Sequence, residues 1–435
     1  MKILVVGGGG REHTLLTKYS KSKKIKKLYS VPGNGLMDYK SEKEVKIYPE
    51  IKPTDKNSIW EIISKEKIDM VDVAQDDPLA EGMVDFLTEK SVATFGPTRE
   101  AAQIEWSKEW SRNFMKKYYL PTPHFAIFTS VNEAKDHIKK LPEGSFFVKA
   151  SGLAAGKGAI RAENRREAFE AIESMKDFGE AGRTFLIEEC LVGEEVSVYA
   201  ICDGANFKIL KPAQDNKPVN NFDEGPNTGG MGSNSPALVA TKVVMKKVKE
   251  IVKQTINGMR EEGRPYKGIL YLGLIVDKNK KVKIIEFNAR WGDPEAQVVV
   301  PGIKNDYLDI VIACLEGRLN KIKIGEDKKS RVCVVGASKG YPGDYSTAKG
   351  KEIFGFEKAL KVPGVTLYGA GILRKSNRFF ANGGRVFSVV GEGKDIFEAR
   401  SKAYQAISLI NFEGNNLHYR TDVGWRDVER EVAYA

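Results

Sequence analysis

Cysteine and histidine are both scarce in this chain of 435 residues. The cysteines stand far apart in apolar surroundings with no CxxC pair, which is typical of buried thiols in a reducing compartment rather than of a disulfide framework. The histidines show no HExxH string or other paired spacing, so a zinc site is not expected. The cysteines are Cys190, Cys202, Cys314 and Cys333, and the histidines are His13, His124, His137 and His418.

Long apolar segments are also missing. No run approaches the roughly 18 residues that a membrane-spanning helix needs, so we expect no membrane protein. The N-terminal string MKILVVGGGGREH lacks a basic segment and a small-residue cleavage site. It is therefore predicted to be a strand that enters a glycine loop, not a signal peptide. Together these features predict a cytoplasmic protein.

The basic excess is moderate, with 69 Lys and Arg against 58 Asp and Glu and a net charge of +11. Basic stretches interleaved with aromatic residues are not evident, which argues against a nucleic-acid partner. The charge agrees better with small anionic substrates such as phosphates. With 41% hydrophobic and 29% charged residues, the composition is that of a globular protein, and the length predicts two to four domains.

The order of the predicted elements indicates a multidomain protein with α/β and α+β parts. Strand-like and helix-like stretches alternate over residues 1–104, as in a parallel sheet that binds its ligand beyond the carboxyl ends of the strands. We predict a central domain from residues 105–120 and 191–326, with a small compact domain inserted at 121–190. Residues 327–435 form the predicted C-terminal domain.

Three helices and one loop are predicted in more detail. Apolar spacing predicts one helix over 78–90 and another over 105–120. Asp395, followed by Glu398 at the capping-box spacing, begins the last predicted helix. Residues 212–236 have little apolar periodicity and are rich in Gly, Asn and Asp, which favours a long binding loop.

The glycine loop GGGGRE at residues 7–12 follows the first predicted strand. Glycines let backbone N–H groups approach an anion at a helix N-terminus, so a phosphate or sugar-phosphate site is one interpretation. A tight turn without a ligand is the second. A dinucleotide site is the third, but Glu12 stands where the G-x-G-x-x-G fingerprint has its last glycine, and its carboxylate would repel a pyrophosphate.

A second loop of small residues lies at 151–158 in the string FFVKASGLAAGKGA. The spacing does not fit a Walker A loop, which needs G-x-x-x-x-G-K-[ST]. The loop suits a flap whose amides fold over a triphosphate, with Lys149 on the preceding strand as a fixed cation. A mobile surface loop with a solvated lysine is the alternative.

Glu286 and Asn288 lie two apart on a predicted strand, in the string KIIEFNARWGDPEAQ. Side chains at i and i+2 of a strand point to one face, so the two oxygen-bearing groups are expected to aim together. Mg²⁺ prefers a few protein oxygens together with phosphate oxygens and water. Arg290 continues on that side and would hold a carboxylate or phosphate. The alternative for Glu286 is a structural bridge to a buried cation.

Several strings together resemble a known family. VVGGGGREHTLL, FGPT, VKASGLAAGKGA, GPNTGGMG and EFNARWGDPEAQ are similar to those of the glycinamide ribonucleotide synthetases, also called phosphoribosylamine–glycine ligases, of the ATP-grasp superfamily. The resemblance runs from residue 3 to about residue 302 and implies an ATP-grasp fold. That fold has an N-terminal parallel-sheet domain, a small mobile lid domain and a C-terminal mixed β/α domain. Ser151, Asn216 and Pro218 stand where the family usually has aspartate, histidine and arginine.

The resemblance also implies which residues form the site. Lys149, Asp215 and Arg290 would be catalytic, and Glu286 and Asn288 would hold the metal. The residues implied to bind ATP are Lys108, Lys149, Gly152, Gly156, Lys157, Gly158, Glu188, Glu189, Leu191 and Glu195. Those implied to bind the amino-sugar phosphate are Gly9, Gly10, Arg11, Glu12, Asn34, Asp215, Asn227, Thr228, Gly229, Arg290, Gly292, Asp293 and Pro294.

The implied activity is the ATP-dependent ligation of glycine to 5-phosphoribosylamine through a glycyl phosphate. ATP would be a co-substrate, Mg²⁺ or Mn²⁺ the cofactor, and the protein a monomer. Another ATP-grasp carboxylate–amine ligase of purine synthesis is the nearest alternative, and the GPNTGGMG string argues against it. A dinucleotide-dependent oxidoreductase is a distant alternative.

Overall fold

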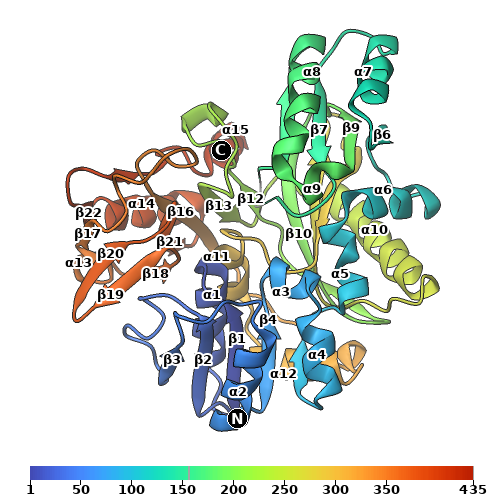
Figure 1. Cartoon of the computed structure of the whole chain (residues 1–435). Helices are drawn as coiled ribbons and strands as arrows, with labels where there is room; N and C mark the ends of the chain where they lie inside the picture. Colours follow the sequence, from blue (N-terminus) through green and yellow to red (C-terminus); the bar gives the residue numbers. More distant parts are fainter. Residues whose placement is uncertain (155–156, 435) are drawn as a thin grey trace.

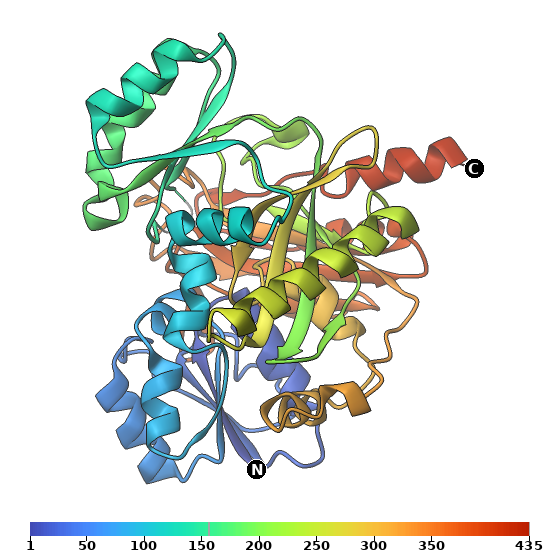
Figure 2. The same cartoon turned by 90° about the vertical axis from the view of Figure 1, so that its right-hand side faces the viewer.

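The computed structural model describes residues 1–154 and 157–434, whose strands form five sheets. In Figure 1 the N-terminal sheet lies at the bottom, a small sheet with two helices projects at the top right, and the C-terminal sheets lie on the left. The view turned by 90° in Figure 2 shows the long helix α10 (Lys242–Glu261) running across the central sheet. The predicted multidomain α/β and α+β class is confirmed.

The N-terminal sheet is parallel, in the order β3-β2-β1-β4-β5, as the alternating pattern predicted. The buried, β-branched run of β1 makes it the middle strand, and the chain turns at once from β1 into helix α1. The strands are β1 (Lys2–Gly7), β2 (Lys27–Pro32), β3 (Val45–Ile47), β4 (Met70–Val73) and β5 (Ala93–Phe95). The helices are α1 (Gly10–Ser20), α2 (Lys56–Glu66), α3 (Asp76–Ala80), α4 (Met83–Glu89) and α5 (Arg99–Trp106).

The small projecting sheet is antiparallel, in the order β6-β9-β7-β8, and has a hydrophobic cluster of its own. We call this sheet and its helices the lid. Its strands are β6 (Phe125–Phe128), β7 (Phe146–Ala150), β8 (Ala159–Ala162) and β9 (Phe185–Glu189). Its helices are α7 (Val131–Lys140), α8 (Arg165–Ser174), η1 (Met175–Phe178) and α9 (Glu180–Arg183).

The central sheet is antiparallel, in the order β11-β10-β14-β15. Its strands are β10 (Glu194–Asp203), β11 (Phe207–Ile209), β14 (Lys267–Val276) and β15 (Val282–Asn288). Besides α10, the helices of this part are α6 (Lys108–Lys117), α11 (Ala296–Val299), η3 (Val300–Gly302), α12 (Tyr307–Leu315) and η4 (Leu319–Lys321).

Two sheets make up the C-terminal part, and the larger one takes in β12 and β13 from the predicted loop over 212–236. That loop is therefore tied to the C-terminal sheet. The larger sheet contains β12 (Gln214–Asp215), β13 (Gly232–Ser235), β16 (Ser330–Ser338), β21 (Arg385–Gly393), β18 (Val365–Gly369) and β23 (Leu417–His418). The smaller one contains β19 (Ile372–Lys375), β20 (Arg378–Ala381), β17 (Glu352–Phe354) and β22 (Asn411–Phe412). The remaining helices are η2 (Asn221–Asp223), α13 (Phe356–Ala359), α14 (Ile396–Ile407) and α15 (Trp425–Tyr434).

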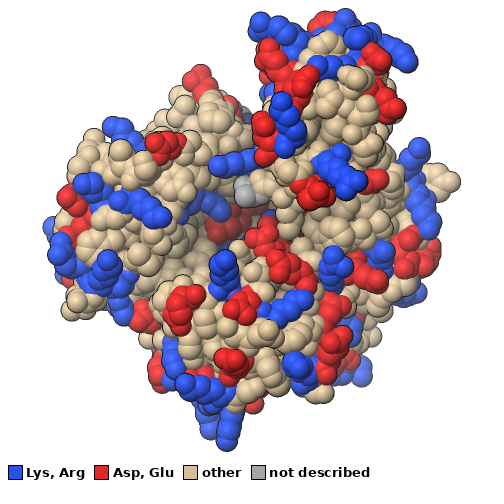
Figure 3. Space-filling model, viewed as in Figure 1, with Lys and Arg blue, Asp and Glu red and all other residues tan. Residues whose placement is uncertain are grey.

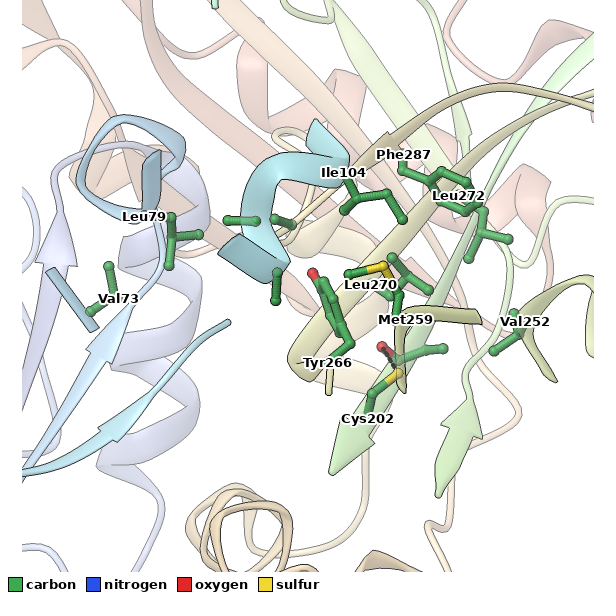
Figure 4. Packing of buried hydrophobic residues seen from close by; sticks show 14 of the residues in the cluster. Val73, Leu79, Ile104, Cys202, Val252, Met259, Tyr266, Leu270, Leu272 and Phe287 are labelled. Atoms are coloured by element: carbon green, nitrogen blue, oxygen red, sulfur yellow. Dashed lines mark hydrogen bonds between the residues drawn. The ribbon is translucent and has the colours of Figure 1, made fainter. Parts of the chain in front are cut away.

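One hydrophobic cluster joins the N-terminal sheet to the central sheet. Figure 4 shows Ile104 of α5 between Val73 and Leu79 on one side and Leu270 and Leu272 of β14 on the other. This packing fixes helix α5, and with it the start of α6, at the boundary of the two sheets. Within the described residues, every helix is too short or too polar to cross a membrane.

Two helix predictions were wrong in the same way. The stretch over 78–90 forms two helices, because Gly82 between them has φ +78°, which interrupts a right-handed helix. The stretch over 105–120 also divides, because Ser107 is extended. The Ser107 hydroxyl accepts a hydrogen bond from Trp110 N at 3.2 Å and so caps a new helix, α6. The spacing of apolar residues continues across both helix interruptions, so it could not reveal them.

Candidate functional site

A cavity of about 770 Å³ lies where the N-terminal sheet, the lid, the central sheet and the C-terminal part meet. Its walls come from the glycine loop after β1, helices α5 and α6, lid strands β7 and β8, strand β15, and the loops around Asn227 and Arg385. Figure 3 shows the surface hollowed there, with acidic side chains at the bottom of the hollow and basic ones around it. The cavity lies beyond the carboxyl end of β1, as predicted.

The glycine loop places Gly9, Arg11 and Glu12 on the cavity wall. The Glu12 carboxylate is buried and already bonded, because Gly9 N donates to it at 2.7 Å and Arg11 Nε donates at 2.5 Å. Gly7 has φ +136°, and a Cβ there would lie 2.4 Å from Glu12 Cγ. The Glu12 side chain therefore packs against the glycine loop at the position where the dinucleotide fingerprint has its last glycine, which argues against a dinucleotide.

Two lysines from different elements face the cavity. Lys149 is the last residue but one of strand β7 and is 7% exposed, and its Nζ lies 2.7 Å from Glu188 Oε2 of β9. Lys108 is the first residue of α6, and its backbone N donates to Ser151 O at 2.9 Å. Glu109 N donates to Ser151 Oγ at 3.0 Å, so the base of the glycine flap holds the start of α6. Both lysines therefore line the same cavity, where they can neutralise a phosphate chain.

The predicted flap, residues 152–158, is only partly on the wall. Leu153, Ala154 and Gly158 line the cavity. A Cβ on Gly152 would lie 2.8 Å from Ala181 Cα, so this glycine permits close backbone packing. Lys157 is exposed. Gly156 lies outside the described residues.

The acidic residues after the flap differ in their surroundings. Glu188 is buried between Lys149 and Arg112, so its side chain is engaged within the protein. Glu189 pairs with Lys283 and accepts from His124 N. Glu195 lies 2.8 Å from Lys217 Nζ, and Leu191 is half-buried. None of these four lies among the cavity-lining residues of the described chain, so their contact with a nucleotide stays a prediction.

Glu286 and Asn288 of β15 both face the cavity, as their spacing predicted. Burial alone would raise the pKa of Glu286, but Lys217, Lys149, Lys108 and Arg290 lower it and keep the carboxylate ionised. The nearest cation in the described residues, Lys217 Nζ, is 3.9 Å from Oε1, too far for a close hydrogen-bonded bridge. The buried Asn288 amide nitrogen has no partner in the described part of the chain. An ionised carboxylate and an amide group on one face of β15 fit a divalent cation that a polyphosphate also holds.

Arg290 follows these ligands and is held by two carboxylates. Its Nη2 lies 2.8 Å from Glu105 Oε1 and 3.7 Å from Asp76 Oδ2, and Nη1 donates to Trp291 O at 3.1 Å. The guanidinium lies on the cavity wall. Burial raises the pKa of Glu105 to about 7 even though the charge of Arg290 lowers it.

Asp215 lies at the other side of the cavity, at the end of β12. Its Oδ1 is buried and has no hydrogen-bond partner within the described residues. Burial, followed by the charge of Glu295, raises the pKa of Asp215 well above its usual range. A carboxyl group in such surroundings holds a proton more tightly than an exposed one, so Asp215 is a candidate for proton transfer with a bound substrate.

The loop after Asp215 brings Asn227, Thr228 and Gly229 to the wall. Thr228 Oγ1 donates to Lys217 O at 2.7 Å and accepts from Gly230 N at 2.9 Å, which folds the loop back on itself. Arg385 Nη1 of β21 donates to Gly229 O at 2.6 Å. The C-terminal sheet therefore sets the position of this loop.

Other residues predicted to bind the substrate form hydrogen bonds between separate segments of the protein. Asn34 Nδ2 donates to Gly8 O at 2.9 Å and to Gly369 O at 2.8 Å, which joins the glycine loop to the C-terminal part. Asp293 and Gly292 line the cavity, and Asp293 accepts from Arg11 N at 3.2 Å. Asn34, Gly10 and Pro294 are not among the described lining residues.

The comparisons with known proteins agree with this geometry. Three models of the phosphoribosylglycinamide synthetase family match the chain: the N domain at residues 1–105, the ATP-grasp (A) domain at 106–296 and the C domain at 331–426.

The chain belongs to the phosphoribosylglycinamide synthetase family.

Relatives in this family cover nearly the whole chain. A phosphoribosylamine–glycine ligase of Caldanaerobacter subterraneus is 41% identical over 97% of this chain and 99% of the relative. The trifunctional purine biosynthetic protein adenosine-3 of Bos taurus is 42% identical over 98% of this chain, which spans 42% of that longer protein. The crystal structure of a phosphoribosylamine–glycine ligase from Thermotoga maritima is 32% identical, with a TM-score of 0.81 and coverage of 98% and 100% of the two chains. The predicted family and the ATP-grasp fold are confirmed.

Sequence reasoning missed several residues that this synthetase fold brings to the site. Lys217, Glu105, Arg112 and Glu295 line the cavity but were given no role. Lys217 stands two residues after Asp215, so the loop containing it was already noted. Arg112 lies one helical turn after Lys108, which puts both on one face of α6. Arg385 lies in the string GGRV near the C-terminus. Its contact with the loop at Gly229 could not be predicted, because the two residues lie far apart in the sequence.

Proposed function

We propose that this chain ligates glycine to 5-phosphoribosylamine with ATP, giving glycinamide ribonucleotide, ADP and phosphate. The observation that carries the proposal is the single cavity in which Lys108, Lys149, Glu286, Asn288 and Asp215 all meet. Phosphoribosylamine–glycine ligases that match this chain over nearly their full length support the choice of substrates.

The reaction follows from the chemistry of the groups. A carboxylate is a poor electrophile, so a glycine carboxylate oxygen attacks the γ-phosphorus of ATP, and the bond to ADP breaks. The amine of phosphoribosylamine then attacks the carbonyl carbon of glycyl phosphate, loses a proton, and expels inorganic phosphate. No covalent enzyme nucleophile is needed, and the described cavity wall has no cysteine or histidine to provide one.

Different residues have different roles in the proposed reaction. Lys108 and Lys149 neutralise the phosphates, and Arg290 orients an anionic substrate group. Asp215 takes the proton of the attacking amine. A divalent cation held by Glu286 and Asn288 would neutralise charge on the transferred phosphoryl group, and we propose Mg²⁺ or Mn²⁺. The glycine flap excludes water from the acyl phosphate, which hydrolyses easily. A monomer, a cytoplasmic location and the absence of a nucleic-acid partner stay predictions.

Phosphate release from ATP tests the proposal. Release should require both glycine and phosphoribosylamine, and Glu286→Ala should lower it by at least about 100-fold, because a charged metal ligand is removed. Glu61→Ala, at an exposed position of α2, is the matched control and should retain wild-type turnover. Release that needs glycine alone, or that occurs only with a different amine acceptor, would contradict the proposed substrates.

A further inference from the structure

Arg112 of α6 is a buried arginine that joins three parts of the molecule. The residue is 3% exposed. Nε donates to Glu188 Oε1 at 2.6 Å and Nη2 donates to Glu188 Oε2 at 2.9 Å, so the guanidinium holds this lid carboxylate with both of its edge donors. Nη1 and Nη2 also donate to Ile284 O at 3.4 Å and Ile285 O at 2.5 Å, on the strand that leads to Glu286.

Every N–H group of Arg112 is used inside the protein. A guanidinium has five N–H donors. Those of Arg112 go to both oxygens of Glu188, to Ile284 O and Ile285 O, and to Met115 Sδ at 3.3 Å. The residue lines the cavity, but it has no donor left for a nucleotide. Its role toward a substrate must therefore act through its partners.

Its main partner, Glu188, also holds Lys149. Glu188 Oε2 lies 2.7 Å from Lys149 Nζ and accepts from Arg112 Nη2, so one carboxylate is shared by two cations. The three residues are 2% to 7% exposed and carry a net charge of +1 by simple count. If Arg112 were absent, Glu188 would neutralise Lys149 and the count would be zero. Lys149 would then attract a phosphate far less.

We infer that Arg112 is a positioning residue that keeps the charge of Lys149 available to the nucleotide phosphates. It does this by binding Glu188 with two hydrogen bonds, which leaves Lys149 with a fixed position and an uncompensated charge. The same guanidinium also donates to the backbone carbonyls of the strand that leads to Glu286. Arg112 therefore positions both Lys149, through Glu188, and the strand that is proposed to bind the metal. The inference rests on the proposed function, in which Lys149 faces ATP.

Four variants separate charge sharing from plain structural support. Arg112→Met makes the trio neutral, and Lys149→Ala removes the phosphate contact altogether. Arg112→Met with Glu188→Gln removes both buried opposite charges and restores a net charge of +1 on Lys149 alone. Arg161→Met, at an exposed position of β8, is the control. Binding of a non-hydrolysable ATP analogue with Mg²⁺ is measured by calorimetry, and the KM for ATP and for glycine by phosphate release.

Arg112→Met should weaken nucleotide binding roughly 10- to 100-fold, as expected when a buried cation no longer offsets a carboxylate beside a ligand site. The KM for glycine should change less than about twofold, since the trio does not face that substrate in the proposal. The double variant should recover binding to within about threefold of the wild type, although it lacks the two-point hydrogen bond. The control should bind as the wild type does.

The double variant decides the question, because it removes Arg112 together with the buried carboxylate that Arg112 binds and leaves a charge only on Lys149, at the cavity wall; it is therefore expected to fold even if Arg112→Met does not. If it binds the analogue as weakly as Lys149→Ala, Arg112 is a structural brace and the inference is overturned. Normal binding by a folded Arg112→Met protein would overturn it as well. A wild-type protein that binds the analogue but does not ligate glycine would contradict the proposed function and leave this ranking of variants intact.

Discussion

Lys217 stands between two carboxylates at the edge of the cavity. Its Nζ lies 2.8 Å from Glu195 Oε2 and 3.9 Å from Glu286 Oε1. It is the leading cation that lowers the pKa of Glu286. We predict that Lys217→Met raises that pKa, because a carboxylate without a neighbouring cation binds its proton more tightly. The acidic limb of kcat/KM against pH should then move to higher pH, with a fall of roughly tenfold or more at neutral pH.

Steady-state phosphate release over a pH series measures this effect. Lys278→Met, in the exposed turn between β14 and β15, is the matched control and should leave the profile in place. A Lys217→Met profile that coincides with that of the wild type would mean that this lysine does not act on Glu286.

Helix α14 shows what a single cap contributes at the scale of an element. Asp395 Oδ1 accepts from Glu398 N at 2.9 Å, so the predicted N-cap is confirmed, but Glu398 Oε2 accepts from Lys394 N at 2.8 Å, the residue before the cap, and so does not complete the capping box. We predict that Asp395→Ala lowers the free energy of unfolding by about 1 kcal/mol, because one helix N–H group loses its acceptor.

Urea unfolding measures the loss, with turnover as a second readout. Turnover should stay at the wild-type level, since α14 packs against β16 and β21 and not against the cavity. Gln405→Ala, at an exposed position of the same helix, should change stability by less than about half a kcal/mol. Equal losses in the two variants would show that the cap has no special effect.

The elements themselves were predictable where a local rule sets them. The strand that enters the glycine loop, the capped helix α14 and the shared direction of Glu286 and Asn288 all follow from residues within a few positions of each other. The breaks at Gly82 and Ser107 were missed, because the apolar spacing continues across both. The contacts of Arg112 with Glu188 and of Arg385 with Gly229 join residues 76 and 156 positions apart. No spacing rule reaches that far, so these parts of the site needed the fold.

His13 connects the N-terminal helix α1 to strand β18 of the C-terminal part. It lies on α1, and its Nδ1 accepts from Gly369 N of β18 at 2.8 Å, while its ring meets the edge of Tyr368. Burial lowers its pKa from 6.5 to about 3. Between those two values the unfolded chain binds a proton that the folded protein excludes, so the stability contributed by neutral His13 is lost as the pH falls below 6.5.

We predict that the wild type loses about 2 kcal/mol more than His13→Asn when the pH falls from about 7.5 to about 5, because asparagine offers an acceptor near the position of Nδ1 but does not titrate. Urea unfolding at both pH values measures the difference. The exposed His124→Asn serves as the control and should follow the wild type. If His13→Asn shows the same pH dependence as the wild type, His13 is not buried in its neutral form.

The fate of the glycine carboxylate oxygens tests the central claim most directly. Glycine labelled with ¹⁸O in its carboxylate is supplied with ATP and phosphoribosylamine, and the inorganic phosphate is analysed by mass spectrometry. Because the carboxylate oxygen that attacks ATP leaves with the phosphoryl group, each phosphate released should carry one labelled oxygen. Phosphate without label, formed at the same rate as glycinamide ribonucleotide, would contradict ligation through glycyl phosphate.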